Sequence, residues 1–95
     1  MNSIKIKSSP TFTKIAKKLH AKHKAILDEN ILAIAKNPHI GTEKKGDLVG
    51  VFVHKFKINK QQYLLAYILI PSKNLVEEIV LISLGSHENF YDNLK

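Results

Sequence analysis

The sequence contains no cysteine and no arginine, and these absences narrow the possible chemistry. Without cysteine, the 95 residues offer no disulfide, no thiolate nucleophile and no cysteine-ligated zinc site. The longest strongly apolar run, residues 63–71, is far shorter than the ~20 residues that span a membrane. No apolar segment follows the charged N-terminus at residues 1–7, so no secretory signal is recognisable. We therefore expect a cytoplasmic protein that does not bind membranes.

Acidic residues are also scarce, and none occurs before Asp28. The net charge is +7, and every basic residue is a lysine. Twelve of the fifteen lysines form two groups: Lys5, Lys7, Lys14, Lys17, Lys18, Lys22 and Lys24, and then Lys44, Lys45, Lys55, Lys57 and Lys60. Such an excess favours a polyanionic partner, either nucleic acid or an acidic protein. It is equally typical of a solvated surface in a lysine-rich proteome, so charge alone leaves both interpretations open.

Length and periodicity predict one α+β domain over residues 1–95, because the chain is long enough for a single core and contains no linker or repeat. The run Ser8-Ser9-Pro10 is typical of a helix start. Apolar residues then recur at helical spacing up to Ile34, with a blurred stretch at residues 20–24. This pattern indicates two helices in a hairpin, or one bent helix, within residues 10–36. Asn37-Pro38 ends the helical region, and Gly41 indicates a loop.

Beyond Gly46 the apolar pattern alternates, which predicts strands at residues 48–58, 62–70 and 76–84. Residues 59–61 form a short connection, and residues 71–74 have the composition of a turn. Short connections make the three strands an antiparallel meander. Residues 3–8 offer a fourth, edge strand. We therefore expect an N-terminal helical hairpin packed on one face of a three- to four-stranded antiparallel sheet.

Alternation within residues 48–58 separates two sets of side chains. Phe52 and Phe56 share a face with His54 and should pack under the helices, whereas Lys55 and Lys57 project together from the opposite face. Two lysines that are neighbours on one strand face suit a bound phosphate, because the phosphate would relieve the repulsion between their charges. The same pattern also fits the polar side of a half-exposed strand.

The order of these elements resembles that of the RelE/ParE toxins over nearly the whole chain. The segment Tyr-Leu-Leu-Ala-Tyr at residues 63–67 is similar to the central strand of that superfamily, which typically ends in an aliphatic-aliphatic-x-Tyr pattern. The ending Gly-Ser-His-x-x-x-Tyr at residues 85–91 is similar to that of the YafQ branch, and it is the most specific motif in the chain. The resemblance implies the toxin of a type II toxin–antitoxin pair, with an acidic antitoxin as its partner.

The resemblance to the RelE and YafQ branches further implies a ribosome-dependent endoribonuclease that cuts mRNA without metal. That chemistry requires an acid, a base and cations around an anionic phosphorane. Carried over onto this sequence, His87 matches the catalytic histidine, and Tyr91 matches the aromatic residue that follows it. Lys55 and Lys57 match the paired lysines of the RelE strand. Further candidates for contacts with RNA phosphates are His54, Lys44, Lys45 and Lys60.

One departure from the family pattern concerns the central strand, where RelE-type toxins usually carry an arginine that contacts the scissile phosphate. Leu64 occupies that position here, and no arginine exists elsewhere to replace it. YafQ-type toxins also have leucine there but add a histidine and an aspartate, near which this sequence offers only Gln62. The candidate set therefore combines RelE-like lysines with a YafQ-like ending.

Two other functions remain open at this point. A ParE-like gyrase poison would have the same fold and no need of His87 or Tyr91, and a catalytically silent basic module would bind nucleic acid or only its antitoxin. We expect no metal, because the five histidines form no compact ligand set with nearby carboxylates. We also expect no nucleotide cofactor, since the chain has no glycine-rich phosphate loop.

Overall fold

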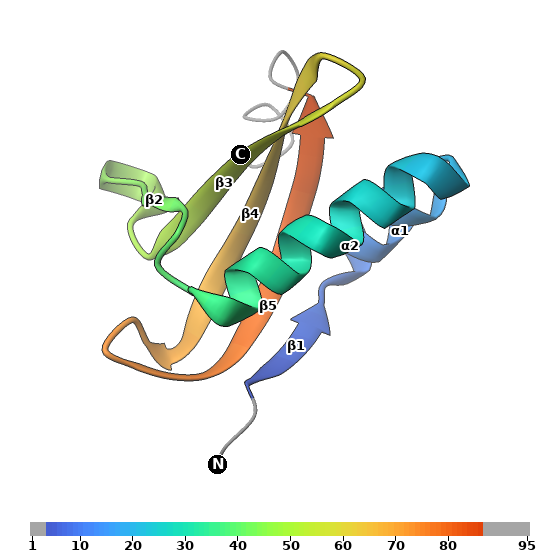
Figure 1. Ribbon diagram of the computed structural model, residues 1–95. Coiled ribbons are helices and arrows are strands. Elements are labelled where there is room, and N and C mark those ends of the chain that lie inside the picture. Colours follow the sequence, from blue (N-terminus) through green and yellow to red (C-terminus); the bar gives the residue numbers. More distant parts are fainter. Residues whose placement is uncertain (1–3, 87–95) are drawn as a thin grey trace.

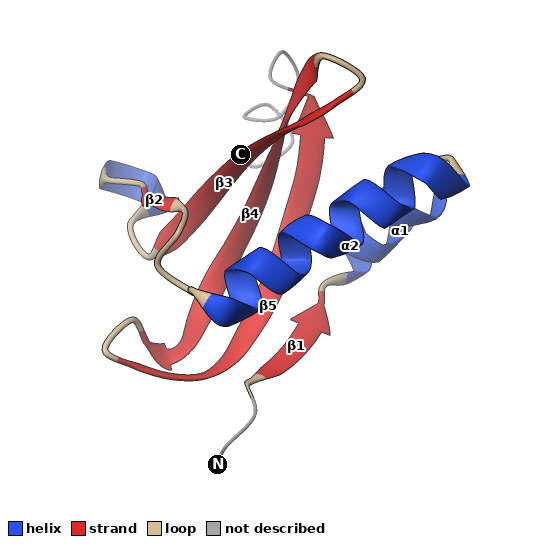
Figure 2. Cartoon of the chain, in the orientation of Figure 1, coloured by secondary structure: helices blue, strands red, loops and turns tan. Residues whose placement is uncertain are grey.

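The computed structural model of the chain describes residues 4–86 and places two helices on one face of a five-stranded sheet (Figure 1, Figure 2). The elements follow the order β1 (Lys5–Ser8), α1 (Pro10–Lys17), α2 (Ala21–Lys36), β2 (Thr42–Glu43), η1 (Gly46–Leu48), β3 (Val51–Ile58), β4 (Gln61–Ser72) and β5 (Leu75–Ser86). The strand order across the sheet is β1-β5-β4-β3-β2. The α+β class and the cover of helices on one face are therefore confirmed. No helix in the described part is long and apolar enough to cross a membrane.

The sheet is mixed rather than purely antiparallel, which corrects the expected three- to four-stranded antiparallel arrangement. The meander β3-β4-β5 is antiparallel as predicted, and residues 5–8 form the predicted edge strand. That strand runs parallel to β5, however, because the helical hairpin carries the chain away before β5 returns beside it. The two-residue strand β2 was not predicted, since a ladder this short leaves no alternation in the sequence.

The helical region consists of two helices, which settles the choice between a hairpin and one bent helix. Ser9 caps α1, and its Oγ accepts a hydrogen bond of 3.0 Å from the backbone N–H of Phe12. The same hydroxyl donates to the carbonyl oxygen of Ile82 at 2.9 Å, and the Ser9 N–H donates to the carbonyl of Leu81. One serine therefore begins the helix and also attaches it to β5.

Glycine and asparagine residues explain where the strands begin and turn. The first long strand begins at Val51 rather than at residue 48, because Gly46–Leu48 is a 3-10 turn and Gly50 has a φ of 90°. Asn59 and Lys60 both have positive φ, 50° and 71°, which is the requirement of a tight type I′ hairpin turn. At the other end of β4, Pro71 lies within the strand instead of the turn, beside a shift in register.

The main core lies between the helices and the sheet. Its largest fully buried side chain is Tyr67, whose hydroxyl donates to the Pro38 carbonyl at 2.8 Å and accepts from the Gly41 N–H at 3.0 Å. Burial raises the pKa of Tyr67, and the hydrogen bond from Gly41 partly opposes that rise. The ring stacks on Phe52 with 5.6 Å between ring centroids. Tyr67 therefore fixes the loop after α2 to the middle of the sheet.

Candidate functional site on the sheet face opposite the helices

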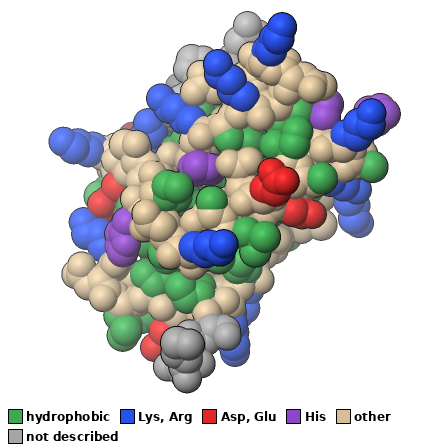
Figure 3. Space-filling model, in the orientation of Figure 1, with side chains coloured by type: hydrophobic (Ala, Val, Ile, Leu, Met, Phe, Trp, Pro, Cys, Tyr) green, Lys and Arg blue, Asp and Glu red, His purple; other side chains and the backbone are tan. Residues whose placement is uncertain are grey.

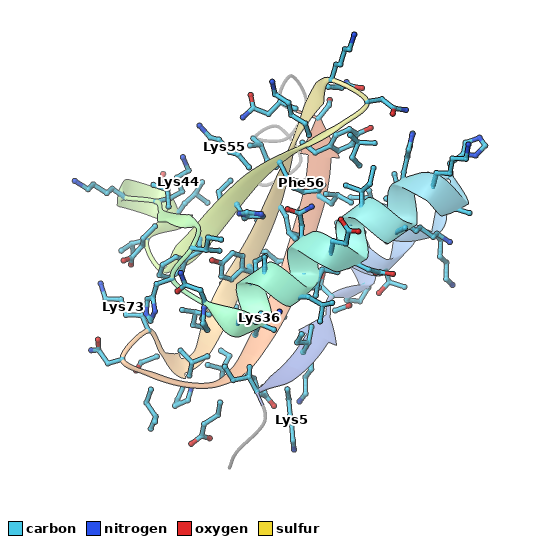
Figure 4. The ribbon with its side chains drawn as sticks, in the orientation of Figure 1. Lys5, Lys36, Lys44, Lys55, Phe56 and Lys73 are labelled. Atoms are coloured by element: carbon cyan, nitrogen blue, oxygen red, sulfur yellow. The ribbon has the colours of Figure 1, made fainter. Side chains whose placement is uncertain are left out.

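Lys55 and Lys57 project from β3 on the side opposite the helices, as the alternation predicted. Both side chains are exposed, whereas Phe52 and Phe56 are buried in the core on the helical side. Lys55 points away from α2, and Phe56 points toward it (Figure 4). Neither lysine forms an ion pair with a carboxylate in residues 4–86. Their charges are therefore available to an external anion.

The neighbouring strand completes this part of the sheet face. In the β3–β4 ladder, Lys57 lies directly opposite Gln62, and Lys55 lies opposite Leu64. Directly paired residues share a face, with Cβ atoms about 4.5–5.5 Å apart. Gln62 is partly exposed, and Leu64 is fully buried. The face therefore presents two cations and one amide above an apolar floor.

The other candidate lysines lie near the two ends of β3. Lys60 is exposed in the β3–β4 turn, close to the Lys57 end. Lys44 and Lys45 follow β2, and the Lys44 N–H donates to the Val51 carbonyl at 2.8 Å, at the beginning of β3. A strand rises about 3.3 Å per residue, so these side chains extend the positive region along roughly 20 Å. Such a length suits an extended polyanion better than a single small ion.

His54 lies on the other face of β3, between the sheet and α2. Its Nε2 is 2.9 Å from Oδ1 of Asn30, whose Nδ2 donates to the Ile26 carbonyl at 2.8 Å. The Asn30 oxygen is therefore the acceptor, and the His54 proton lies on Nε2. The imidazole stacks on Phe56 with 5.9 Å between ring centroids, and burial lowers the pKa of His54. The structure thus separates His54 from the pair Lys55 and Lys57 and places it in a contact between layers.

Asn30, the partner of His54, is not singled out by any pattern in the sequence. It lies 24 positions from His54, on a different element, and an asparagine in mid-helix carries no recognisable signal. The remaining candidates, His87 and Tyr91, lie outside the described residues. Within the described part of the chain, no group of three or more histidine, aspartate or glutamate side chains is arranged to hold a metal ion.

Comparisons with known proteins decide the family. The model of the ParE-like toxins of type II bacterial toxin–antitoxin systems matches residues 6–95. The chain belongs to this ParE-like toxin family. A search of curated proteins gave no match.

Solved structures share the fold of this ParE-like toxin at low sequence identity. The RelBE2 toxin–antitoxin complex from Mycobacterium tuberculosis matches with a TM-score of 0.73 and 16% identity, covering 90% of this chain and 99% of that chain. The intact RelBE toxin–antitoxin complex from E. coli matches with a TM-score of 0.66 and 21% identity, covering 86% and 94%. The isolated RelE toxin from E. coli gives a TM-score of 0.66 and 19% identity, covering 87% and 83%.

Leu64 is a packing residue in this ParE-like toxin. Leu64 is 0% exposed and forms a small buried cluster with Val53 and Ala66. Val51 and Ile82 pack against the same cluster. The side chain therefore contributes to packing, and the cations nearest to it on this face come from β3.

Proposed function

We propose that this ParE-like toxin is an endoribonuclease that cuts mRNA on the ribosome without a metal cofactor. The observation that carries the proposal is the pair Lys55 and Lys57, exposed side by side and without ion pairs in residues 4–86. Two cations at adjacent positions of one strand face suit a phosphate that gains negative charge during reaction. A fold shared with RelE toxins supports the same proposal.

The proposed reaction is a transesterification within the RNA. The ribose 2′-oxygen forms a bond to the adjacent phosphorus, and the bond from phosphorus to the 5′-oxygen breaks. The products are a 2′,3′-cyclic phosphate and a 5′-hydroxyl. Lys55 and Lys57 stabilise the phosphorane. The 2′-hydroxyl loses a proton and the departing 5′-oxygen gains one; His87 carries out one of these two transfers, with water as the partner in the other. Histidine suits this task because the ordinary pKa of an imidazole is near 6.5. Tyr91 stacks on a base, a contact worth ~1–3 kcal/mol in nucleic-acid complexes.

The test compares growth and mRNA cleavage after induced expression in a bacterial host. The variants are Lys55→Ala, Lys57→Ala and His87→Ala, and the control is Lys24→Ala, which removes the same charge from an exposed position on α2. We expect the wild type and Lys24→Ala to arrest growth and to cut a translated reporter mRNA, as mapped by primer extension. Each of the other three should lose most of the cleavage. Equal cleavage by the wild type and Lys57→Ala would refute the role of the strand face.

A second candidate is a gyrase poison, which the description of the matching family as ParE-like favours. A gyrase poison would arrest growth, break the DNA or alter its supercoiling, and leave the mRNA intact. The same induction experiment separates the two functions when plasmid topology is measured in parallel. Arrest without mRNA cleavage and with changed topology would replace the ribonuclease proposal by this one.

We also propose an acidic antitoxin as the partner of the helical face, consistent with the toxin–antitoxin complexes among the structural relatives. The face carries lysines around its rim and fewer acidic side chains (Figure 3). The lysines of α1, of the residue that follows it and of the first turn of α2 form no ion pair within residues 4–86; they are Lys14, Lys17, Lys18, Lys22 and Lys24. The expected result is co-purification of an acidic partner whose affinity falls as salt rises. An affinity that does not depend on salt would contradict this interface.

A further inference from the structure

Gln62 differs in chemistry from the residues around it on the sheet face opposite the helices. Across β3, β4 and β5, this face contains the rows Lys57–Gln62, Lys55–Leu64–Gly85 and Val53–Ala66–Ser83. Ser83 is only 2% exposed, and the remaining members are lysines or apolar residues. Gln62 is thus the accessible side chain next to the two lysines that carries both a hydrogen-bond donor and an acceptor. The exposed hydroxyl of Thr42 lies opposite Val53, two rows away from Lys57.

The hydrogen-bonding groups of the Gln62 amide have no side-chain partner in the described part of the chain. The residue is nonetheless partly shielded from solvent. The side chain has one acceptor oxygen and two N–H donors. It lies on the same face as Lys57, directly across the ladder. A group bound by Lys57 therefore lies within reach of the amide.

Lysine and glutamine take different parts in nucleic-acid recognition. Lysine contacts phosphate and fixes the position of the strand, whereas contacts to base edges determine sequence preference. A glutamine amide matches adenine, to which it accepts from the amino group and donates to a ring nitrogen. Bases of single-stranded RNA are read along their Watson–Crick and Hoogsteen edges in this way.

We propose that Gln62 reads the base beside the phosphate held by Lys55 and Lys57, and that it selects adenine at that position. This inference rests on the proposed ribonuclease function and adds the residue that gives it sequence preference. Gln62 takes no part in proton transfer. Its removal therefore changes where RNA is cut more than how much is cut.

Gln61 provides a matched control on the same strand. It lies opposite Ile58, on the other face of the sheet, and it is exposed. The test maps the 5′-hydroxyl ends of cellular mRNA after induction of the wild type, Gln62→Met and Gln61→Met. Methionine keeps the unbranched shape of glutamine and removes the amide. A third variant, Gln62→Glu, keeps only acceptor oxygens, which match the amino group of cytosine.

For the wild type and Gln61→Met we expect adenine to be enriched about fivefold or more at one position flanking the cut, on the scale of a single base contact. Gln62→Met should cut with no enrichment there, and Gln62→Glu should shift the preference toward cytosine. The inference is overturned if Gln62→Met retains the wild-type preference, or if the wild type shows no preference for adenine at either flank. Failure of the ribonuclease proposal itself looks different, because then the wild type produces no new 5′ ends at all.

Discussion

Replacing Tyr67 by phenylalanine removes one oxygen atom from the middle of the fold. That oxygen has two partners, the Pro38 carbonyl and the Gly41 N–H, and the ring is fully buried. The substitution leaves both backbone groups without their partner while keeping the stacking on Phe52. An unsatisfied buried group costs about 1–3 kcal/mol, so we expect the free energy of unfolding to fall by about 2 kcal/mol.

The assay is urea denaturation of the purified protein, followed by circular dichroism. A loss of about 2 kcal/mol corresponds to a fall in Tm of roughly 10 °C for a domain of this size. The m-value should stay constant, since the surface exposed on unfolding does not change. Tyr63→Phe is the control, because Tyr63 is only partly buried and its hydroxyl forms no hydrogen bond within residues 4–86. That variant should differ from the wild type by less than about 0.5 kcal/mol.

A double substitution tests whether the Tyr67 hydroxyl acts through Gly41. A Cβ atom at Gly41 would lie 2.8 Å from the Tyr67 hydroxyl oxygen and 3.0 Å from the backbone of Val53. Gly41→Ala should therefore destabilise the wild type more than it destabilises Tyr67→Phe, with a coupling of about 0.5 kcal/mol or more. If the two single changes are additive and Tyr67→Phe is as stable as Tyr63→Phe, the loop is held by other contacts and the reasoning fails.

Three further predictions concern stability at other points of the fold. Burial lowers the pKa of His54, so the native state binds a proton at this imidazole less readily than the unfolded state does. The free energy of unfolding should therefore be highest above pH 6.5, the ordinary pKa of histidine, and should fall as the pH is lowered below that value. Denaturation at pH 5 and pH 7.5 should show this fall in the wild type and a smaller one in His54→Gln, and equal falls would contradict the assignment. Lys60→Gly should raise the free energy of unfolding by about 0.5–1 kcal/mol, because it relieves a φ of 71° that glycine adopts without strain; a loss of stability would show that the lysine side chain matters more than the turn. Ser9→Ala should cost about 1–2 kcal/mol, because it removes both the cap of α1 and the bond to the Ile82 carbonyl. Ser72→Ala, at the exposed end of β4, should cost less than half as much in the same titration.

The features of the fold that depend on neighbouring residues could be predicted from the sequence, whereas the pairing of distant segments could not. Ser9 and Pro10 mark the start of α1, and the alternation from Val51 to Ile58 places Lys55 and Lys57 opposite the core, because these signals depend only on neighbours in the chain. The parallel pairing of β1 with β5 has no such signal, since it joins Lys5 to Glu78 across most of the sequence. The turn at Asn59 and Lys60 was expected as a short connection, but its φ values are a property of the closed hairpin.

The same distinction holds for the candidate site, where single residues could be predicted and their contacts could not. The lysines were recognisable from charge and alternation, which are local properties. The pairing of Gln62 with Lys57 and the bond between His54 and Asn30 depend on register and layer packing, and no pattern of single residues encodes them. The ending with His87 and Tyr91 was selected through resemblance to a family, and its role stays a prediction.

The parallel pairing of β1 with β5 also means that the sheet cannot be completed until residues 78–81 are available to β1. Strand β1 is synthesised well before its partners at residues 78–81. Helical turns and the β3–β4 hairpin depend on near neighbours and can form early, whereas closing a loop of some seventy residues is a late and slow step. Because Ser9 also bonds to Leu81 and Ile82, the hydrogen bonds that attach the start of the first helix to the sheet cannot form until then. A nascent chain interrupted before β5 is complete therefore lacks one edge of the sheet and the anchor of α1.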